Sequence, residues 1–190
     1  MSTPASRVDG DGNDMSACCS TYGNVAGAHF DEKIAKRDLE SYRKKGPGTT
    51  ARLLRDLLVG TGAVKGVLLD VGSGVGGLSF ELLDRGAERV IAVDASPAYL
   101  AAAAQEATRR DRLGVVEFIH GDFVDVGPQI PSATLVTLDR VICCYPSFEP
   151  LLHESLGYAQ HAFAYSYPQD MWYVHAAIGV ENDLRRLKSK

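Results

Sequence analysis

The sequence predicts an α/β protein with a doubly wound, mostly parallel sheet, and three observations support this prediction. First, short apolar runs such as "GVLLDV" and "RVIAVD" lack polar alternation, which is typical of buried parallel strands. Second, helical patterns alternate with these runs, as β-α-β units require. Third, four glycines lie within six residues after the first run, where sheets of this kind bind ligands.

The first two helices are expected before any strand. Apolar residues recur at helical spacing from His29 to Lys45, and "KKGPG" breaks this pattern. A second helix follows, with Thr49 or Thr50 as its N-cap. Four leucines are expected on one face of that helix, at positions 53, 54, 57 and 58.

The rest of the chain alternates between strands and helices. Strands are predicted at 66–71, 89–94, 115–122, 133–143 and 162–167. Helices are predicted at 76–85, 96–110, 147–161 and 169–187, with Ser96 as an N-cap and Pro97 in the first turn. No later apolar run follows, so the sheet is expected to lack two further strands.

Length and composition favour a single domain. Of the 190 residues, we expect 1–16 to form a disordered tail and 17–190 to form the domain. Residues 17–62 would supply N-terminal helices and a lid, and residues 63–190 the ligand-binding core. The net charge of −4 does not favour nucleic-acid binding, and no run is long enough for a membrane span. We therefore expect a cytoplasmic protein.

The four cysteines form two adjacent pairs, Cys18–Cys19 and Cys143–Cys144. Neighbouring cysteines rarely form a disulfide with each other, and structural zinc usually takes ligands two to four residues apart. We expect reduced thiols and no metal site. A soft metalloid ligand such as trivalent arsenic is the alternative that the paired thiols leave open.

The glycine-rich stretch "VGSGVGG" matches two ligand fingerprints, that of a dinucleotide and that of a methyl donor. Asp70, two residues before Gly72, would repel a pyrophosphate and attract an ammonium or sulfonium group. Asp94 ends the next strand and can accept hydrogen bonds from two ribose hydroxyls. Asp122 is expected beside an adenine amino group, with Phe123 against the ring. These carboxylates favour a cationic methyl donor over a nicotinamide dinucleotide.

Residues 67–96, followed by "GDF" and "VTLDRVICCYP", resemble the class I S-adenosylmethionine-dependent methyltransferases. Within that class, "FDEKIAKRDLESYRKKGPGTTARLL" and "CCYPSFEPLL" resemble a bacterial branch grouped with the magnesium-protoporphyrin O-methyltransferases. The resemblance implies a Rossmann-like fold and S-adenosyl-L-methionine as cofactor. The residues that it places around this cofactor are Tyr22, Asp70, Gly72, Ser73, Gly74, Asp94, Ala95, Asp122, Phe123, Leu138 and Asp139.

The acceptor half of such a reaction is less visible in the sequence. No residue stands out as a general base, although His175 is a candidate, and the acceptor is expected to be an unidentified small molecule. The short C-terminus would leave the fifth strand as an open edge, which favours a homodimer through that edge. An adenosyl-binding module with weak catalysis and a nicotinamide-dependent oxidoreductase are the alternatives that we keep.

Overall fold

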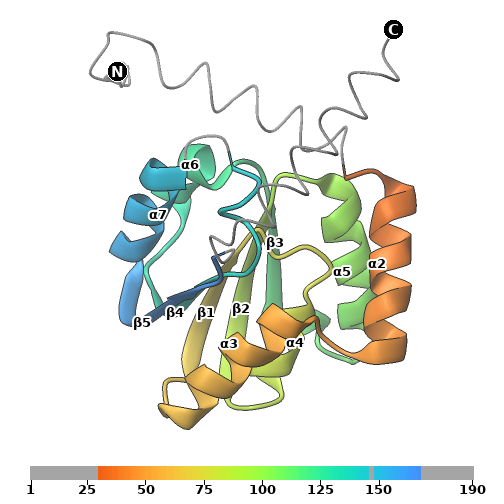
Figure 1. The fold of residues 1–190 in the computed structure, drawn as a ribbon, viewed down its shortest axis with the longest axis horizontal. Coiled ribbons are helices and arrows are strands. Elements are labelled where there is room, and N and C mark those ends of the chain that lie inside the picture. The colour runs from red at the N-terminus through yellow and green to blue at the C-terminus, as the bar shows by residue number, and fades with distance from the viewer. Residues whose placement is uncertain (1–29, 146–147, 168–190) are drawn as a thin grey trace, which may run out of the picture.

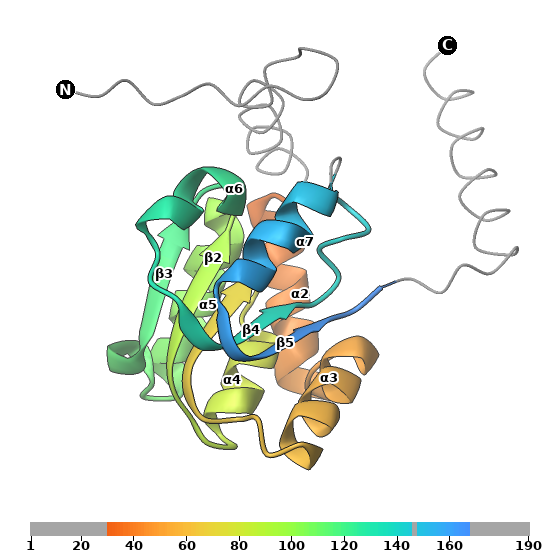
Figure 2. The same ribbon diagram turned by 90° about the vertical axis from the view of Figure 1, so that its left-hand side faces the viewer.

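The structure is a computed structural model that describes residues 30–145 and 148–167 (Figures 1 and 2). Its elements are α2 (Glu32–Lys45), α3 (Thr49–Gly60), β1 (Gly66–Val71), α4 (Gly77–Leu83), β2 (Ala87–Asp94), α5 (Pro97–Arg109), η1 (Leu113–Val115), β3 (Val116–His120), α6 (Phe123–Val126), η2 (Gly127–Gln129), β4 (Ala133–Leu138), α7 (Phe148–Gly157) and β5 (Ala159–Tyr165).

The five strands of the described residues form one parallel sheet in the order β3-β2-β1-β4-β5. This confirms the predicted α/β class and doubly wound topology. The order reverses beside β1, which pairs with β2 on one side and with β4 on the other. Ligands of open α/β sheets bind at the carboxyl ends of the strands near such a reversal. Among the described residues, β3 and β5 are the edge strands.

Helices cover both faces of the sheet (Figure 2). Each face has its own apolar core. Alternate residues of β1 belong to different cores, since Leu68 packs with α2 to α5 and Leu69 packs with α6 and α7. Helix α2 is also fastened to α5, because Arg43 Nε donates to the buried carboxylate of Glu106 at 2.8 Å. The N-terminal helices are therefore an integral wall of the domain.

Several predicted features of the N-terminal helices need correction. Thr49 is the first residue of α3 and Gly48 is its N-cap, with no side-chain capping bond. The four leucines do not share a buried face, because Leu54 and Leu58 are buried while Leu53 and Leu57 are 65% and 60% exposed. Helix α2 begins close to its predicted start and is capped by Asp31, whose carboxylate accepts from the Ile34 N–H at 2.9 Å.

Other elements of the chain also differ from the prediction. Strand β4 ends at Leu138, and the chain turns at Arg140, whose φ is 62°. Helix α7 ends at Gly157, so His161 lies in β5 and not at a helix end. The four-residue helix α6 was not predicted; Asp122 caps it by accepting from the Val124 N–H at 3.1 Å. The predicted cap at Ser96 is confirmed, since its hydroxyl accepts from the Tyr99 N–H.

Candidate active site

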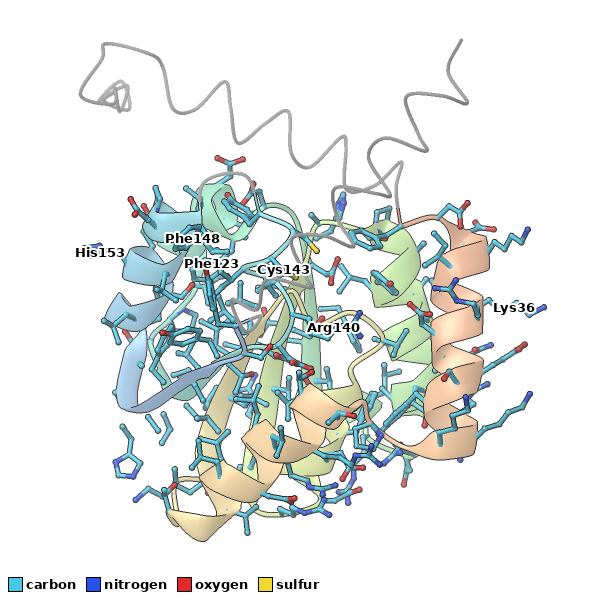
Figure 3. All side chains as sticks on the ribbon, viewed as in Figure 1. Lys36, Phe123, Arg140, Cys143, Phe148 and His153 are labelled. Carbon is cyan, nitrogen blue, oxygen red and sulfur yellow. The ribbon has the colours of Figure 1, made fainter. Side chains whose placement is uncertain are left out.

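A cavity of about 700 Å³ lies at the carboxyl ends of the strands, against the turn between α2 and α3. Its volume is within the range of small-molecule sites. Figure 3 shows Arg140 and Cys143 over this end of the sheet, whereas His153 and Lys36 point outward. The predicted site residues that line the cavity are Asp70, Gly72, Ser73, Gly74, Asp94, Ala95, Asp122, Phe123 and Asp139.

The glycine-rich loop links β1 to α4 in a backbone conformation that favours glycine. The φ angles of Gly72, Gly74 and Gly76 are 68°, 55° and 78°. Gly72 lies against Val141, while a Cβ at Gly74 would meet nothing within 4 Å. The loop therefore packs tightly at Gly72 and leaves open space at Gly74, where a ligand can approach the backbone.

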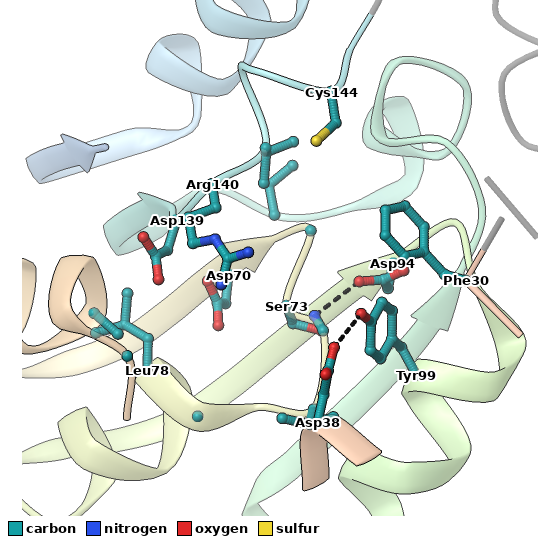
Figure 4. Close-up of a pocket in the computed structure, with 18 of the residues that line it drawn as sticks. Phe30, Asp38, Asp70, Ser73, Leu78, Asp94, Tyr99, Asp139, Arg140 and Cys144 are labelled. Atoms are coloured by element: carbon teal, nitrogen blue, oxygen red, sulfur yellow. Dashed lines mark hydrogen bonds between the residues drawn. The ribbon is translucent and has the colours of Figure 1, made fainter. Parts of the chain in front are cut away.

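Asp94 ends β2 and supports the glycine-rich loop (Figure 4). One carboxylate oxygen accepts from the Gly74 N–H and the other from the Ser96 N–H, both at 2.8 Å. Burial raises the pKa of Asp94, and these two hydrogen bonds oppose the shift. Each oxygen keeps a further lone pair, so the carboxylate can still accept from two hydroxyls of a ligand.

Asp70, which was expected to face a cationic ligand, is almost fully buried, with only 2% of the residue exposed. Its oxygens accept from the hydroxyls of Ser79 at 2.5 Å and Thr137 at 2.8 Å. Thr137 is its register partner on β4. Burial raises the pKa of Asp70 to about 6, against the effect of these hydroxyls. Asp70 is therefore a buried charge at the cavity floor that also joins β1 to α4 and β4.

Asp122 is engaged by a side chain that the sequence did not single out. The Tyr145 hydroxyl lies 2.8 Å and 2.9 Å from the two oxygens of its carboxylate. Burial raises the pKa of Asp122, and the bond to Tyr145 opposes the shift. The neighbouring Phe123 is buried and packs edge-on against Tyr158, with ring centroids 5.3 Å apart. The Asp122–Tyr145 pair fastens the loop after β4 to the end of β3.

The predicted residues at the end of β4 separate into two groups. Leu138 is fully buried in the apolar core and is not among the residues that line the cavity, so its place beside the ligand stays a prediction. Asp139 does line the cavity, and its carboxylate accepts from the Ser166 hydroxyl at 2.8 Å. The same Ser166 oxygen accepts from the Arg140 N–H at 2.7 Å. Strand β5 thus holds the turn that follows β4.

An aromatic wall beside the N-terminal ends of α2 and α5 completes the cavity and was missed by the sequence analysis. Phe30 and Tyr99 line it with their ring centroids 5.3 Å apart. The Tyr99 hydroxyl donates to the Asp38 carboxylate at 2.8 Å (Figure 4). The only signal for Tyr99 was its place three residues after the Ser96 cap, on the first turn of α5.

The cysteines of the second pair are both free and exposed, with their sulfur atoms 3.4 Å apart. Cys144 lines the cavity, and burial raises the pKa of its thiol to about 11, so it is protonated at neutral pH. In residues 30–145 and 148–167, no three His, Cys, Asp or Glu side chains gather to hold a metal ion. Cys18, Cys19, Tyr22 and His175 lie outside the described residues.

The helices of the described part of the chain include none with the length and apolar character of a membrane span.

Of the histidines described, His120 contacts the Ala95 carbonyl at 3.2 Å, and His153 and His161 are exposed. None of these three lines the cavity.

The family model described as a methyltransferase domain matches residues 68–160. No curated protein sequence matches the chain. The solved structure of magnesium protoporphyrin IX methyltransferase from Synechocystis with bound S-adenosylhomocysteine superposes with a TM-score of 0.68. It is 20% identical, and the match covers 84% of this chain and 78% of that one.

A second structure of the Synechocystis enzyme, with bound S-adenosylmethionine, has a TM-score of 0.63 at 22% identity, covering 77% of this chain and 76% of that one. A Methanococcus maripaludis protein provisionally described as an S-adenosylmethionine-dependent methyltransferase has a TM-score of 0.60 at 19% identity. That match covers 80% of this chain and 70% of that one. At these identities the likeness concerns the fold.

The match to a methyltransferase domain and the shared fold support the predicted class, the class I S-adenosylmethionine-dependent methyltransferases. The fold of this chain resembles that of magnesium protoporphyrin IX methyltransferase, as the sequence predicted. The Synechocystis enzyme binds S-adenosylmethionine in its solved structure, which supports the predicted cofactor. Neither a nicotinamide-dependent oxidoreductase nor a weakly catalytic module is favoured by these findings.

Proposed function

We propose that this enzyme transfers a methyl group from S-adenosylmethionine to a small-molecule acceptor within the cavity. The observation that carries the proposal is the open space at Gly74 beside the buried carboxylate of Asp94. A ribose placed there would donate its hydroxyls to the remaining lone pairs of Asp94. The bound cofactor supplies a methyl group activated by a positive sulfur.

The residues of the cavity fit this cofactor by three further observations. The Ser73 hydroxyl oxygen is buried without a hydrogen-bond partner among the described residues, so a polar ligand atom would satisfy it. Asp70 places negative charge at the floor, which attracts an ammonium or sulfonium group. Arg140 lines the same side and offers a cation to the carboxylate of the methionine portion.

The remaining predicted contacts belong to the same proposal. Ala95 and Phe123 would pack against the adenine, and Asp122 would accept from its amino group through a lone pair that Tyr145 leaves free. Asp139 would border the transferred methyl. These residues mainly align the acceptor with the methyl group and exclude water, which suffices for an in-line displacement. A base is needed only for an acceptor that must lose a proton.

Calorimetry with the full chain tests the proposal. S-adenosylmethionine and S-adenosylhomocysteine are expected to bind with micromolar affinity, and the oxidised and reduced nicotinamide dinucleotides are not. A chromatographic assay for S-adenosylhomocysteine, run over a panel of small acceptors, then tests turnover. Binding of a nicotinamide dinucleotide in place of the adenosyl ligands would overturn the proposal.

A further inference from the structure

Arginines of the described chain nearly all pair with carboxylates. Ion pairs engage arginines 37, 43, 55, 85, 89, 109, 110 and 112. Within residues 30–145 and 148–167, only Arg52 and Arg140 form no such pair, and both line the cavity. A guanidinium group is suited to carboxylates and phosphates, so each of these arginines is available to an anion.

Most carboxylates of the cavity lie on the strand side, and the exception is Asp38 of α2, which pairs with Arg37 and accepts from the Tyr99 hydroxyl. Asp70, Asp94, Asp122 and Asp139 all lie at or just beyond the ends of strands, and each accepts hydrogen bonds from the protein. Arg52, by contrast, lies in the first turn of α3, across the cavity from the strand ends. Within the described residues, its guanidinium group makes one hydrogen bond, a long 3.5 Å contact to the Thr49 hydroxyl. The acidic floor suits a cationic donor, and the opposite wall suits an anion.

A tight turn brings a second cation to the same wall. Lys45 is the last residue of α2, and only Gly46, Pro47 and Gly48 separate it from α3. Gly46 has a φ of 75°, which reverses the chain direction there. Lys45 lines the cavity together with Arg52, whereas its neighbour Lys44 does not. Two cations from adjacent helices thus flank one turn at the cavity mouth.

We propose that Arg52 and Lys45 bind an anionic group, a carboxylate or a phosphate, of the methyl acceptor. The inference rests on the proposed function, because it assigns the strand-end side of the cavity to the methyl donor. Arg140 follows β4 on that donor side, so its cation serves the donor and not the acceptor. The α2–α3 turn is then the part of the cavity that selects acceptors by charge.

Binding of small probe anions tests this site before any acceptor is known. Benzoate, phenyl phosphate and the neutral benzamide are titrated by ligand-observed NMR into the full chain, with and without saturating S-adenosylhomocysteine. We expect benzoate or phenyl phosphate to bind more tightly than benzamide, and the comparison of the two anions shows which group is preferred. Arg52→Gln and Lys45→Gln should each weaken that anion roughly fivefold to tenfold.

Lys44→Gln is the matched control, because it removes the same charge one residue away from the cavity. It should leave anion binding unchanged, and all three variants should bind S-adenosylhomocysteine as the unmodified chain does. The inference is overturned if no anion binds better than benzamide, or if Lys44→Gln weakens binding as much as the other two. Weaker S-adenosylhomocysteine binding in Arg52→Gln would also overturn it, by assigning Arg52 to the donor. If the unmodified chain does not bind S-adenosylhomocysteine at all, that result contradicts the proposed function instead.

Discussion

Gly72 lies so close to Val141 that a Cβ on the glycine would come within 3.0 Å of the valine side chain. This relationship joins the loop after β1 to the loop after β4, which are 69 positions apart and meet over the cavity. The contact explains why the first glycine of the motif has a structural role, whereas Gly74, with open space around its Cα, has room for a ligand.

We predict that Gly72→Ala and Gly74→Ala act differently. Gly72→Ala should lower the free energy of unfolding by roughly 2–4 kcal/mol, because it adds both a clash and an unfavourable positive φ. Gly74→Ala should cost only about 1 kcal/mol of stability, yet should weaken S-adenosylhomocysteine binding at least tenfold by filling the ligand's space. Chemical denaturation and calorimetry measure the two effects. Adding Val141→Ala should recover part of the stability lost at Gly72 and none of the affinity lost at Gly74.

Asp94→Ala should weaken S-adenosylhomocysteine binding by roughly 1.5–3 kcal/mol, the range for losing a charge-assisted hydrogen bond. Calorimetry gives this value directly. Asp84→Ala is a suitable control, since Asp84 is an exposed carboxylate that follows α4 and does not line the cavity. Unchanged affinity in Asp94→Ala would remove Asp94 from the cofactor site.

Cofactor affinity should fall as the pH decreases through 6. The pKa of Asp70 is raised to about 6, so its carboxylate is mostly ionised at pH 7.5 and mostly protonated at pH 5. Protonation removes the negative charge that attracts the ammonium group of S-adenosylhomocysteine, and we expect roughly threefold to tenfold weaker binding. In Asp70→Asn the affinity should be low at both pH values. A variant that keeps the full pH dependence would assign it to another group.

Tyr145→Phe should lower the free energy of unfolding by about 1–2 kcal/mol, because the buried Asp122 carboxylate loses its phenol donor. Thermal unfolding at neutral pH measures this loss. The destabilisation should shrink in acid, since a protonated Asp122 no longer needs that donor. Tyr165→Phe, at an exposed position of β5, is the control and should have almost no effect.

The sequence predicted a homodimer through the edge of β5, and we keep this as a prediction. Within the described residues β5 pairs only with β4, so its other edge has no strand partner there. Light scattering over a concentration series should show a rising mass if this edge associates. Tyr165→Pro would remove an N–H group from the open edge of β5, because the N–H of the next residue, Ser166, donates to Leu138 on the β4 side, and it should reduce that rise. A constant monomer mass would contradict the prediction.

The fold was predictable because buried parallel strands leave a strong signal in sequence. The β1 run is apolar apart from Asp70 and has no polar alternation, and its predicted bounds match the structure. Helix α6, by contrast, has four residues and is too short for any helical period. Leu53 and Leu57 show the limit of periodicity: apolar residues at helical spacing do not show which side of a helix meets the core.

The site was predictable where it depends on strand ends, and not where it depends on packing. Asp70, Asp94 and Asp122 follow apolar runs, so their shared position was visible in the sequence. The hydroxyl partners of Asp70 come from α4 and β4, and Tyr99 reaches the cavity from α5. Such partners are brought together only by the folded arrangement. Leu138 shares a strand end with these carboxylates, but its side chain points to the opposite core.

Ser166 connects the edge of the sheet to two residues that line the cavity. Its hydroxyl donates to Asp139 and accepts from the Arg140 N–H, immediately after β5. A chain that paired with β5 would shift the position of Ser166. Asp139 and Arg140, which are hydrogen-bonded to Ser166, would move with it. Pairing at β5 would then change the geometry of the cavity. Because pairing of two copies increases with protein concentration, the specific activity of the enzyme would change with its own concentration.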